Sequence, residues 1–455
     1  MVKQRSQMGT EPARTLIVGL GLTGVSCARY LHERNVPVVI IDSRLHPPGL
    51  SMLREQMFGV SVVTGGFDPL VFASAERLVV SPGISIQEPE IQAARKRGVE
   101  IVGDVELFAH EVKAPVAAIT GSNGKSTVTT LLGEMARCAG SEVGVGGNIG
   151  LPVLDLLSDK NELYVVELSS FQLETTHSLK PKVSAVLNLS PDHLDRYDDI
   201  EAYAAAKSGI YEGAETRVFN QDDPQVMAMC GQPQANDLFF TLQEPNTPNV
   251  FGIRLQDGEA WLCRGEQALL PASELQLPGR HNLANALAAL AMGAALELPT
   301  TAMLEALCTF SGLPHRTQFV AEHAGVRWYN DSKATNVGAC VAALEGMANS
   351  VGCIVLIAGG ESKDADFSGL VTVVEHTVRA VVLIGRDAAL IEDALGGVVP
   401  VARAANMDAA VARAEELAKP GDCVLLSPAC ASFDMFRSFE HRGEAFSDAV
   451  RRLMA

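Results

Sequence analysis

The sequence predicts an α/β protein of three domains whose sheets are mostly parallel. Short apolar runs rich in β-branched residues alternate with Ala-rich helical stretches, which is the pattern of parallel sheets with crossover helices. The chain has 455 residues, more than one hydrophobic core usually serves. We expect a Rossmann-like domain over 1–103, a central domain of the phosphate-loop (P-loop) ATPase type over 104–312, and a second Rossmann-like domain over 313–455.

Composition limits the classes of function. The formal net charge of -18 disfavours a general nucleic-acid-binding protein, because such proteins neutralise phosphates with Lys and Arg. The nine cysteines form no C-x-x-C pair or zinc-like spacing, which indicates reduced thiols rather than a disulfide framework. No apolar stretch has the length of a membrane span or the form of a signal peptide. We therefore expect a cytoplasmic monomer that binds neither nucleic acid nor membrane.

The first block opens with a strand, a glycine turn, a helix and a second strand, in the run TLIVGLGLTGVSCARYLHERNVPVVIIDS. Gly19, Gly21 and Gly24 satisfy G-x-G-x-x-G, and Asp42 follows the second strand as in a dinucleotide-binding fold. Taken alone, this pattern favours an NAD-dependent oxidoreductase. The same turn serves any diphosphate, however, and no second half carries a plausible hydride-transfer residue. The segment RLVVSPGI has the same pattern of a strand followed by a turn. This turn could face a ligand or be a plain turn.

The second block opens with a shortened phosphate-binding loop in VAAITGSNGKSTVTTLL. Ile119 replaces the first glycine of G-x-x-x-x-G-K-[ST], while Gly121 and Gly124 still allow a tight turn that points N–H groups at phosphate oxygens. The helix beginning near Lys125 adds the positive end of its dipole. The lysine can reach the β- and γ-phosphates, and Ser126 or the next hydroxyl can face Mg²⁺. The alternative is a Gly/Ser turn that binds nothing.

Three further residues of this block have chemistry that their local sequence leaves open. Glu167 ends the strand LYVVEL, where a carboxylate could hold Mg²⁺ or simply face solvent. His193 follows the next apolar strand, but a lone histidine is more often structural than a ligand. Lys207 lies in EAYAAAKSGIY, which by itself indicates an ordinary helix with an exposed lysine.

The third block begins around GLPHRTQFV, after the Ala-rich helix that follows LPGRHN. Its expected strands are CIVLIAGG, AVVLIG and CVLLSPA, again separated by helical stretches.

Taken together, the motifs resemble those of the Mur ligase family and its folylpolyglutamate synthetase relatives, which use the shorter loop TGSNGKST. The resemblance spans nearly the whole chain. The other segments that carry it are GGNIG (146–150), VVELSSFQLE (165–174), NLSPDHLDRY (188–197), AAKSGIY (205–211), LPGRHNLANALAA (277–289), NDSKATN (330–336) and SPACASFDMFRSFEHRGEAF (427–446).

The resemblance implies an ATP-dependent amide ligase of cytoplasmic peptidoglycan precursor synthesis. A carboxylate oxygen is a very poor leaving group, so ATP would activate the acid as an acyl phosphate, with release of ADP and phosphate. The negative charges gathered by this step call for metal ions and cationic side chains. The segments are most similar to those of members that add D-glutamate to UDP-N-acetylmuramoyl-L-alanine. The D-N-P-R signature of the diamino-acid members is absent.

The resemblance also implies the residues of the ATP site. The catalytic residues would be Lys125, His193 and Lys207. The Mg²⁺ ligands would be Ser126, Glu167, His193 and Lys207, the last as a carbamate whose oxygens suit a hard cation. ATP would be bound by Gly121, Asn123, Gly124, Lys125, Ser126, Thr127, Asn282, Asn285, Arg316 and Asp331. Because the last two lie in the third block, catalysis would need domain closure that excludes water.

Two further sites follow from the same resemblance. The UDP part of the acceptor would contact Leu22, Thr23, Asp42, Ser43, Arg44, Ser81, Gly83 and Asn148. D-Glutamate would contact Thr335, Lys363, Ser432 and Phe439. A dicarboxylate needs a cation and hydroxyl donors, which this set supplies, whereas a diamino acid would need anionic groups around its distal ammonium.

Three alternatives stay open at this stage. An oxidoreductase would change the absorbance of a nicotinamide cofactor. A non-catalytic nucleotide sensor would bind ATP without amino-acid-dependent phosphate release. Another Mur ligase, or a ligase similar to folylpolyglutamate synthetase, would prefer a different amino acid.

Overall fold

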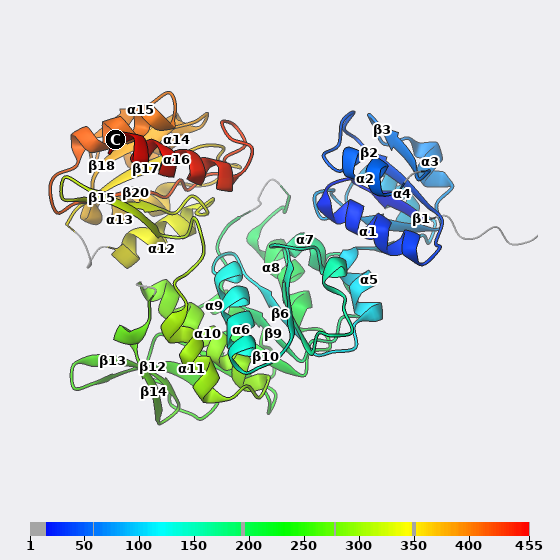
Figure 1. Ribbon diagram of the computed structural model, residues 1–455, viewed down its shortest axis with the longest axis horizontal. Coiled ribbons are helices and arrows are strands. Elements are labelled where there is room, and N and C mark those ends of the chain that lie inside the picture. The colour runs from blue at the N-terminus through cyan, green and yellow to red at the C-terminus, as the bar shows by residue number, and fades with distance from the viewer. Residues whose placement is uncertain (1–14, 58, 193–195, 277–278, 348–351, 455) are drawn as a thin grey trace, which may run out of the picture. The chain divides into compact units, whose positions relative to one another are not determined.

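The computed structural model describes residues 15–57, 59–192, 196–276, 279–347 and 352–454. Three sheets flanked by helices make up this part of the chain (Figure 1), and most of their strand pairs are parallel. The predicted α/β fold class is therefore confirmed. None of the described helices is long and apolar enough to cross a membrane.

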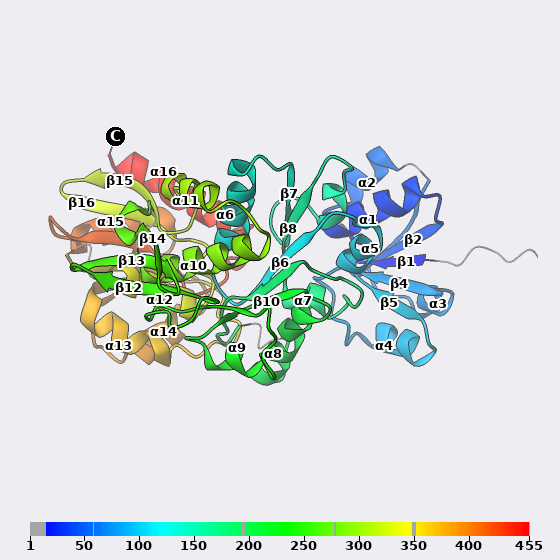
Figure 2. The ribbon, with the colours of Figure 1, turned by 90° about the horizontal axis from the view of Figure 1, so that it is seen from below.

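The N-terminal sheet has five parallel strands in the order β3-β2-β1-β4-β5. Figure 2 shows α1 and α2 on one face of it and α3 and α4 on the other. The strand order reverses between β1 and β4, which is where such folds bind ligands at the carboxyl ends of their strands. The elements are β1 (Thr15–Val18), α1 (Leu22–Glu33), β2 (Val38–Asp42), α2 (Leu50–Gln56), β3 (Ser61–Thr64), α3 (Pro69–Ala73), β4 (Arg77–Val80), α4 (Pro89–Lys96) and β5 (Glu100–Val102).

A tight glycine turn joins β1 to α1. Gly19 has a φ of 97°, which favours glycine, and a Cβ at Gly24 would lie only 2.0 Å from the carbonyl oxygen of Gly19. The turn therefore brings the start of α1 close to the carboxyl edge of the sheet.

The central sheet has nine strands in the order β14-β13-β12-β11-β10-β9-β6-β8-β7. β6 pairs with β8, and β8 with β7, in parallel, whereas β12, β13 and β14 form antiparallel hairpins. The strands are β6 (Val116–Thr120), β7 (Val143–Gly147), β8 (Leu163–Glu167), β9 (Val183–Val186), β10 (Thr216–Asn220), β11 (Leu238–Phe240), β12 (Val250–Gln256), β13 (Glu259–Arg264) and β14 (Gln267–Pro271).

The helices of this region follow the strands in the alternation that the sequence predicts. α6 packs against α10 and α11 (Figure 1), and its apolar residues Val128, Leu131, Leu132 and Met135 are buried. The helices are α5 (Asp104–Glu111), α6 (Lys125–Cys138), α7 (Ser170–Leu173), α8 (Ile200–Ser208), α9 (Pro224–Ala228), α10 (Arg280–Ala295) and α11 (Thr300–Thr309), with short 3-10 turns at Val153–Leu156, Gly209–Tyr211 and Ala272–Glu274.

The C-terminal sheet has six strands in the order β15-β16-β20-β17-β18-β19, and only the β15–β16 pair is antiparallel. One apolar layer joins it to α12, α13 and α14, and a second joins its other face to α15 and α16. The elements are β15 (Gln318–His323), β16 (Val326–Asn330), α12 (Val337–Met347), β17 (Ile354–Gly359), α13 (Ser368–Thr377), β18 (Val378–Ile384), α14 (Ala388–Leu395), β19 (Val401–Arg403), α15 (Met407–Leu417), β20 (Cys423–Leu426) and α16 (Phe439–Leu453).

Candidate active site

The phosphate-binding loop connects β6 to α6, as the motif predicts. Gly124 precedes the helix with a left-handed φ of 81° and, as glycine, has no side chain to cap the first turn. A helix start of this kind can direct its leading N–H groups at an anion. A Cβ at Gly124 would lie 2.3 Å from Asn285 Oδ1, so glycine also lets α10 approach the loop.

Lys125 folds back over its own loop. Its Nζ donates hydrogen bonds to the carbonyl oxygens of Gly121, at 2.7 Å, and of Ser122, at 2.9 Å. Phosphate oxygens are charged acceptors and form stronger hydrogen bonds with an ammonium than neutral carbonyls do. The lysine can therefore exchange these partners for a nucleotide without leaving the loop.

A cavity of about 150 Å³ lies beside the loop. Seven of the residues predicted to bind ATP line it, whereas Gly121, Lys125 and Ser126 are their neighbours in the loop and helix but do not line it. The lining also includes His281 and Lys333, which the sequence reasoning did not select. The seven predicted residues are Asn123, Gly124, Thr127, Asn282, Asn285, Arg316 and Asp331.

Two residues from the start of the C-terminal domain reach this cavity. Arg316 Nη2 donates to Ser126 Oγ at 2.8 Å. This hydrogen bond joins the Arg316 guanidinium directly to the start of α6. Asp331 follows β16 and accepts hydrogen bonds from Ser427 Oγ, at 2.8 Å, and from the backbone N–H of Thr317, at 3.0 Å. Burial raises the pKa of the Asp331 carboxyl to about 6, against the lowering effect of these hydrogen bonds.

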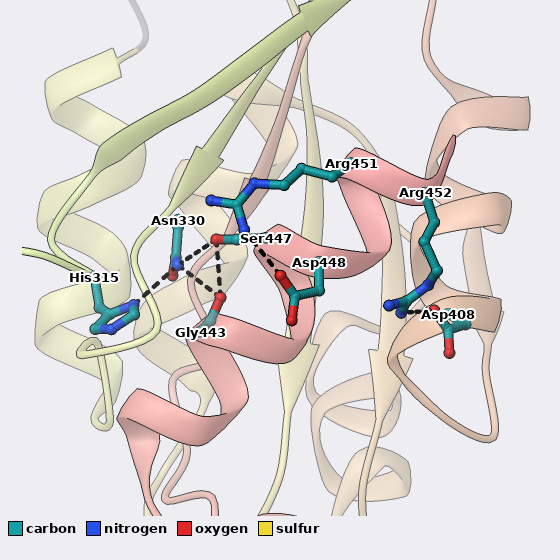
Figure 3. A network of polar contacts seen from close by, with 8 residues as sticks. All are labelled: His315, Asn330, Asp408, Gly443, Ser447, Asp448, Arg451 and Arg452. Atoms are coloured by element: carbon teal, nitrogen blue, oxygen red, sulfur yellow. Dashed lines mark hydrogen bonds and ion pairs between the residues drawn. The ribbon is translucent and has the colours of Figure 1, made fainter. Parts of the chain in front are cut away.

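A polar network holds the loop that carries Arg316. Figure 3 shows Asn330, at the end of β16, facing His315 and the first turns of α16. Asn330 Nδ2 lies 3.0 Å from His315 Nδ1 and donates to the carbonyl oxygen of Gly443 at 2.9 Å. A Cβ at Gly443 would lie 2.3 Å from His315 Nδ1, so the approach requires glycine. The sequence reasoning missed this network, because no short pattern links His315, Asn330 and Gly443.

Glu167 is the described carboxylate best suited to a cation. It is 1% exposed, its Oε1 accepts a hydrogen bond of 2.6 Å from Asn148 Nδ2, and its Oε2 has no hydrogen-bond partner among the described residues. A buried carboxylate oxygen without a partner is costly, and Mg²⁺ prefers such hard oxygen ligands. His193, its predicted companion, lies outside the described residues. Among the described residues, no group of three or more His, Cys, Asp or Glu is arranged so that it could hold a metal ion.

Lys207 is buried, so the interpretation of its helix as one with an exposed lysine is wrong. The side chain is 1% exposed, and Nζ donates to Thr120 Oγ1 at 3.3 Å at the end of β6. The local sequence could not indicate this, because the alanines around the lysine give α8 no clear polar face. Burying an ammonium is costly, which favours a function or a chemical change that uses the site.

A second cavity, of about 490 Å³, lies at the carboxyl edge of the N-terminal sheet. Gln172, which was not predicted, lines it with seven of the predicted residues. These are Leu22, Thr23, Ser43, Arg44, Ser81, Gly83 and Asn148.

Asp42 is the member of the predicted UDP set that does not line this cavity. Its side chain is fully buried and accepts hydrogen bonds from the backbone N–H of Leu20, at 2.7 Å, and from Arg44 Nη2, at 2.7 Å. Burial alone would raise the pKa of Asp42, but these hydrogen bonds outweigh it and lower the pKa. The carboxylate therefore holds Arg44 at the rim of the cavity.

Of the four residues predicted to bind D-glutamate, Thr335, Lys363 and Ser432 lie on loops of the C-terminal domain, and Phe439 is the first residue of α16. Thr335 donates its backbone N–H to Lys333, whose ammonium lies 3.8 Å from the centre of the Phe439 ring. Lys363 and the buried Ser432 lie on two loops that Glu361 and Ala431 join through backbone hydrogen bonds of 3.0 and 2.9 Å. These contacts relate Thr335 to Phe439 through Lys333, and the loop of Lys363 to that of Ser432, and the role of all four residues stays a prediction.

Three family models match consecutive parts of the chain. They describe the N-terminal domain of MurD-like Mur ligases over residues 13–103, the Mur ligase middle domain over 119–293, and the Mur ligase glutamate ligase domain over 315–430.

Curated relatives match over almost their full length. The UDP-N-acetylmuramoylalanine--D-glutamate ligase of Nitrosococcus oceani is 55% identical over 97% of this chain and 97% of its own. The protein of the same name from Pseudomonas aeruginosa is 52% identical over 96% of this chain and 98% of its own.

Solved structures share the fold at lower identity. The UDP-N-acetylmuramate-alanine ligase MurC from Thermotoga maritima has a TM-score of 0.61 at 18% identity, and the alignment covers 97% of this chain and 99% of that one. MurF from Acinetobacter baumannii has a TM-score of 0.60 at 17% identity, covering 98% and 95%.

Proposed function

The chain belongs to the Mur ligase family, and we propose that it uses ATP to join D-glutamate to UDP-N-acetylmuramoyl-L-alanine. Relatives that are 52–55% identical over nearly the whole chain are named for this activity. Within the chain, the observation that carries the proposal is the meeting of Asn123, Arg316 and Asp331 at one cavity beside the phosphate loop. A ligase of this kind must hold ATP where two further substrates can reach it.

The reaction divides into two transfers that balance. In the first, the carboxylate of the acceptor attacks the γ-phosphorus of ATP, ADP leaves, and an acyl phosphate forms. In the second, the amine of D-glutamate attacks the carbonyl carbon, inorganic phosphate leaves, and the nitrogen loses a proton as the amide forms. Phosphorylation by ATP thus converts a carboxylate oxygen, which is a very poor leaving group, into part of a phosphate, which leaves readily.

Lys125 and Arg316 supply the positive charge for the first transfer. Both already lie at the phosphate loop, through contacts with Gly121 and Ser126 respectively. Charge that develops on the transferring phosphoryl group is stabilised most by cations that are in place before the reaction. The N–H groups at the start of α6 add to the same field.

The Mg²⁺ proposal rests on Glu167. Its unpartnered Oε2 suits a divalent cation, with Ser126, Lys207 and His193 as the further ligands that the resemblance implies. Bound Mg²⁺ would neutralise charge on the phosphate oxygens. Asn148 lines the larger cavity and donates to Glu167, so one side chain touches both the acceptor pocket and the candidate ligand.

Lys207 enters the proposal as a carbamate. Addition of CO₂ to the neutral amine forms an N–C bond and releases a proton, which replaces a buried ammonium by an anion with two oxygens. Its position beside Thr120, at the start of the phosphate loop, supports such a role.

We assign the larger cavity to the UDP part of the acceptor, and Thr335, Lys363, Ser432 and Phe439 to D-glutamate. We also propose that the three domains have limits near 103 and 312, and that the protein works in the cytoplasm as a monomer. Size-exclusion chromatography with light scattering would check the oligomeric state.

An amino-acid panel tests the proposed function. With ATP, Mg²⁺ and UDP-N-acetylmuramoyl-L-alanine, phosphate release should depend on D-glutamate, with L-glutamate, L-alanine and diaminopimelate much poorer. The reversed stereocentre cannot place two carboxylates and one amine in the same three positions, so polar groups of the site lose their partners. Equal rates with L-glutamate, or a preference for diaminopimelate, would overturn the substrate while leaving an ATP-dependent ligase.

A further inference from the structure

The residues that line the larger cavity form two walls. The turns that follow β1, β2 and β4 form the first wall, and the end of β7 and the loop after it form the second, together with Gln172. A sugar nucleotide that reaches from one wall to the other needs them at a fixed separation. We propose that Asp155 is a positioning residue for the acceptor, because it fastens the first wall to the second through α1. The inference rests on the proposed function and deepens it by naming the residue that keeps the acceptor pocket in shape.

The side chain of Asp155 binds two residues of α1. Ser26 Oγ donates to Asp155 Oδ1 at 2.7 Å, and Arg29 Nη1 donates to the same oxygen at 3.2 Å. Ser26 is 1% exposed, and the side chains of Arg29 and Asp155 are 36% and 21% exposed. A carboxylate that is shared by a buried hydroxyl and a guanidinium holds its partners more firmly than an isolated ion pair at the surface does.

These contacts lie on the side of α1 that begins at the cavity. Leu22, Ser26 and Arg29 are spaced i, i+4 and i+7, so they lie on one face of the helix. Leu22 is the first residue of α1 and lines the cavity with Thr23, so the position of the helix decides where both residues meet a ligand. A hold on Ser26, one turn further along, therefore fixes this part of the first wall.

The backbone of Asp155 is tied to the second wall. Its N–H donates to the carbonyl oxygen of Pro152, which lines the cavity, at 3.0 Å, within the 3-10 turn Val153–Leu156. Asn148, further back in the same loop, donates its backbone N–H to the carbonyl oxygen of Glu167 at 2.8 Å and its side-chain amide to Glu167 Oε1. The second wall is thus held by Glu167 at one end and by the turn that carries Asp155 at the other.

The consequence for binding depends on how many walls a ligand touches. Without the Asp155 contacts the two walls can separate, and a ligand that touches both must restore their spacing when it binds. Its apparent Kd then rises by the inverse of the fraction of protein in the competent arrangement. UMP carries the uracil, the ribose and one phosphate, which we assign to the first wall, so its Kd should not depend on Asp155.

Isothermal titration calorimetry with UDP-N-acetylmuramoyl-L-alanine and with UMP tests the inference in wild type and in Asp155→Ala. The Kd of the acceptor should rise roughly 5- to 20-fold, as for the loss of hydrogen bonds to a charged group, while the Kd of UMP stays within about 2-fold. The kcat at saturating acceptor should also stay within about 2-fold, because the bound acceptor restores the spacing. Asp155→Asn keeps an oxygen for the Ser26 hydroxyl and should show a smaller rise.

Asp159→Ala is the matched control, because it removes an exposed carboxylate from the same segment, just after the 3-10 turn. Both of its dissociation constants should equal those of wild type. A parallel rise of the acceptor and UMP constants in Asp155→Ala, or an acceptor constant that this variant leaves unchanged, would overturn the inference.

Ser26→Ala removes one of the two contacts from the side of α1 and covers the case in which Asp155→Ala fails to fold. It should raise the Kd of the acceptor roughly 2- to 10-fold without an effect on UMP. An unchanged acceptor constant in folded Ser26→Ala would contradict the inference. Failure of wild-type protein to bind the acceptor, or to release phosphate with ATP and D-glutamate, would instead refute the proposed function, so the two failures are distinguishable.

Discussion

Lys207 is the residue whose surroundings differ most from what its local sequence indicates. Alanines flank it on one side and Ser-Gly on the other, yet the side chain is buried and its ammonium donates to Thr120 at the end of β6. A lysine in such a place is stable only if it is paired, neutral or chemically changed. Its burial is therefore a stronger reason to test it than its sequence was.

Lys207→Ala should lower turnover roughly 10²- to 10³-fold, comparable to the loss of other groups that stabilise transition-state charge. Added formate or acetate should restore part of the rate by replacing the carbamate oxygens. The measurement is the initial rate of phosphate release against carboxylate concentration. The exposed Lys160→Ala is the control and should show neither loss nor rescue. Full activity of Lys207→Ala would exclude a role for this side chain.

Among the elements, α5 carries two acids whose surroundings shift their pKa values in opposite directions. Burial raises the pKa of Asp104 to about 6, although Gln172 Nε2 donates to its Oδ2 at 3.2 Å. Burial opposes ionisation of Glu106 too, but hydrogen bonds from His177 and Ser178 outweigh it and lower the pKa. One helix therefore contains one acid that destabilises the fold when charged and one that stabilises it.

Asp104→Asn should stabilise the protein at neutral pH relative to wild type. The folded-state pKa lies above the unfolded value of 3.8, so wild type loses stability as pH rises from about 4 to about 6, by an order of 3 kcal/mol at most. The variant lacks this loss. Its gain in melting temperature should be larger at pH 7.5 than at pH 4.5.

Glu106→Gln should show the opposite trend. Its folded-state pKa is below the unfolded one, so its stabilisation is present above the unfolded pKa and disappears as pH falls. The variant should melt below wild type at pH 7.5 and approach it at acidic pH. Parallel pH profiles for the two variants would contradict the assigned surroundings.

The first turns of α16 set the position of the loop that holds Arg316. Gly443→Ala would bring a Cβ to 2.3 Å from His315 Nδ1, and the ring or the loop must move. Overpacking of this kind costs about 1–3 kcal/mol, and the displaced Arg316 should lower kcat/KM for ATP roughly 10-fold. Melting temperature and ATP kinetics measure the two effects.

Gly369→Ala in α13 is the matched control. The nearest atom to its added Cβ is Val337 Cγ1 at 3.7 Å, an ordinary contact, so stability and ATP kinetics should be preserved. Unchanged ATP kinetics in a destabilised Gly443→Ala would separate the packing at α16 from the position of Arg316.

At the scale of the whole molecule, no described residue lines both candidate cavities. UDP and ADP should therefore raise the melting temperature independently of each other. At a concentration of 100 times its Kd, each ligand should add about 2.7 kcal/mol to the free energy of unfolding. Arg44→Ala should abolish the shift caused by UDP and retain that caused by ADP, each compared with the unliganded variant. Loss of both shifts would contradict the separation of the sites.

Features of the fold and of the candidate site could be predicted from the sequence where a few consecutive residues specify them. The phosphate loop and the glycine turn before α1 are encoded within a few consecutive residues, and the fold class follows from the alternation of strands and helices. The pairs Asp192–Lys363 and His315–Asn330 join residues far apart or in different elements, and no short pattern specifies them. Asp42 shows a third case, because its position was apparent but its use as an internal acceptor depends on Leu20 and Arg44.

The packing of α6 has a consequence for synthesis of the chain. The helix ends at residue 138, whereas two helices that pack against it, α10 and α11, begin at 280 and 300. At about 5–20 residues per second, a ribosome needs on the order of 10 s to make the intervening chain. Through that interval the nascent phosphate loop precedes a helix that lacks two of its packing partners. The packing of the helix that follows the candidate phosphate-binding loop is thus completed late in translation, and until then the apolar residues of that helix lack these two neighbours.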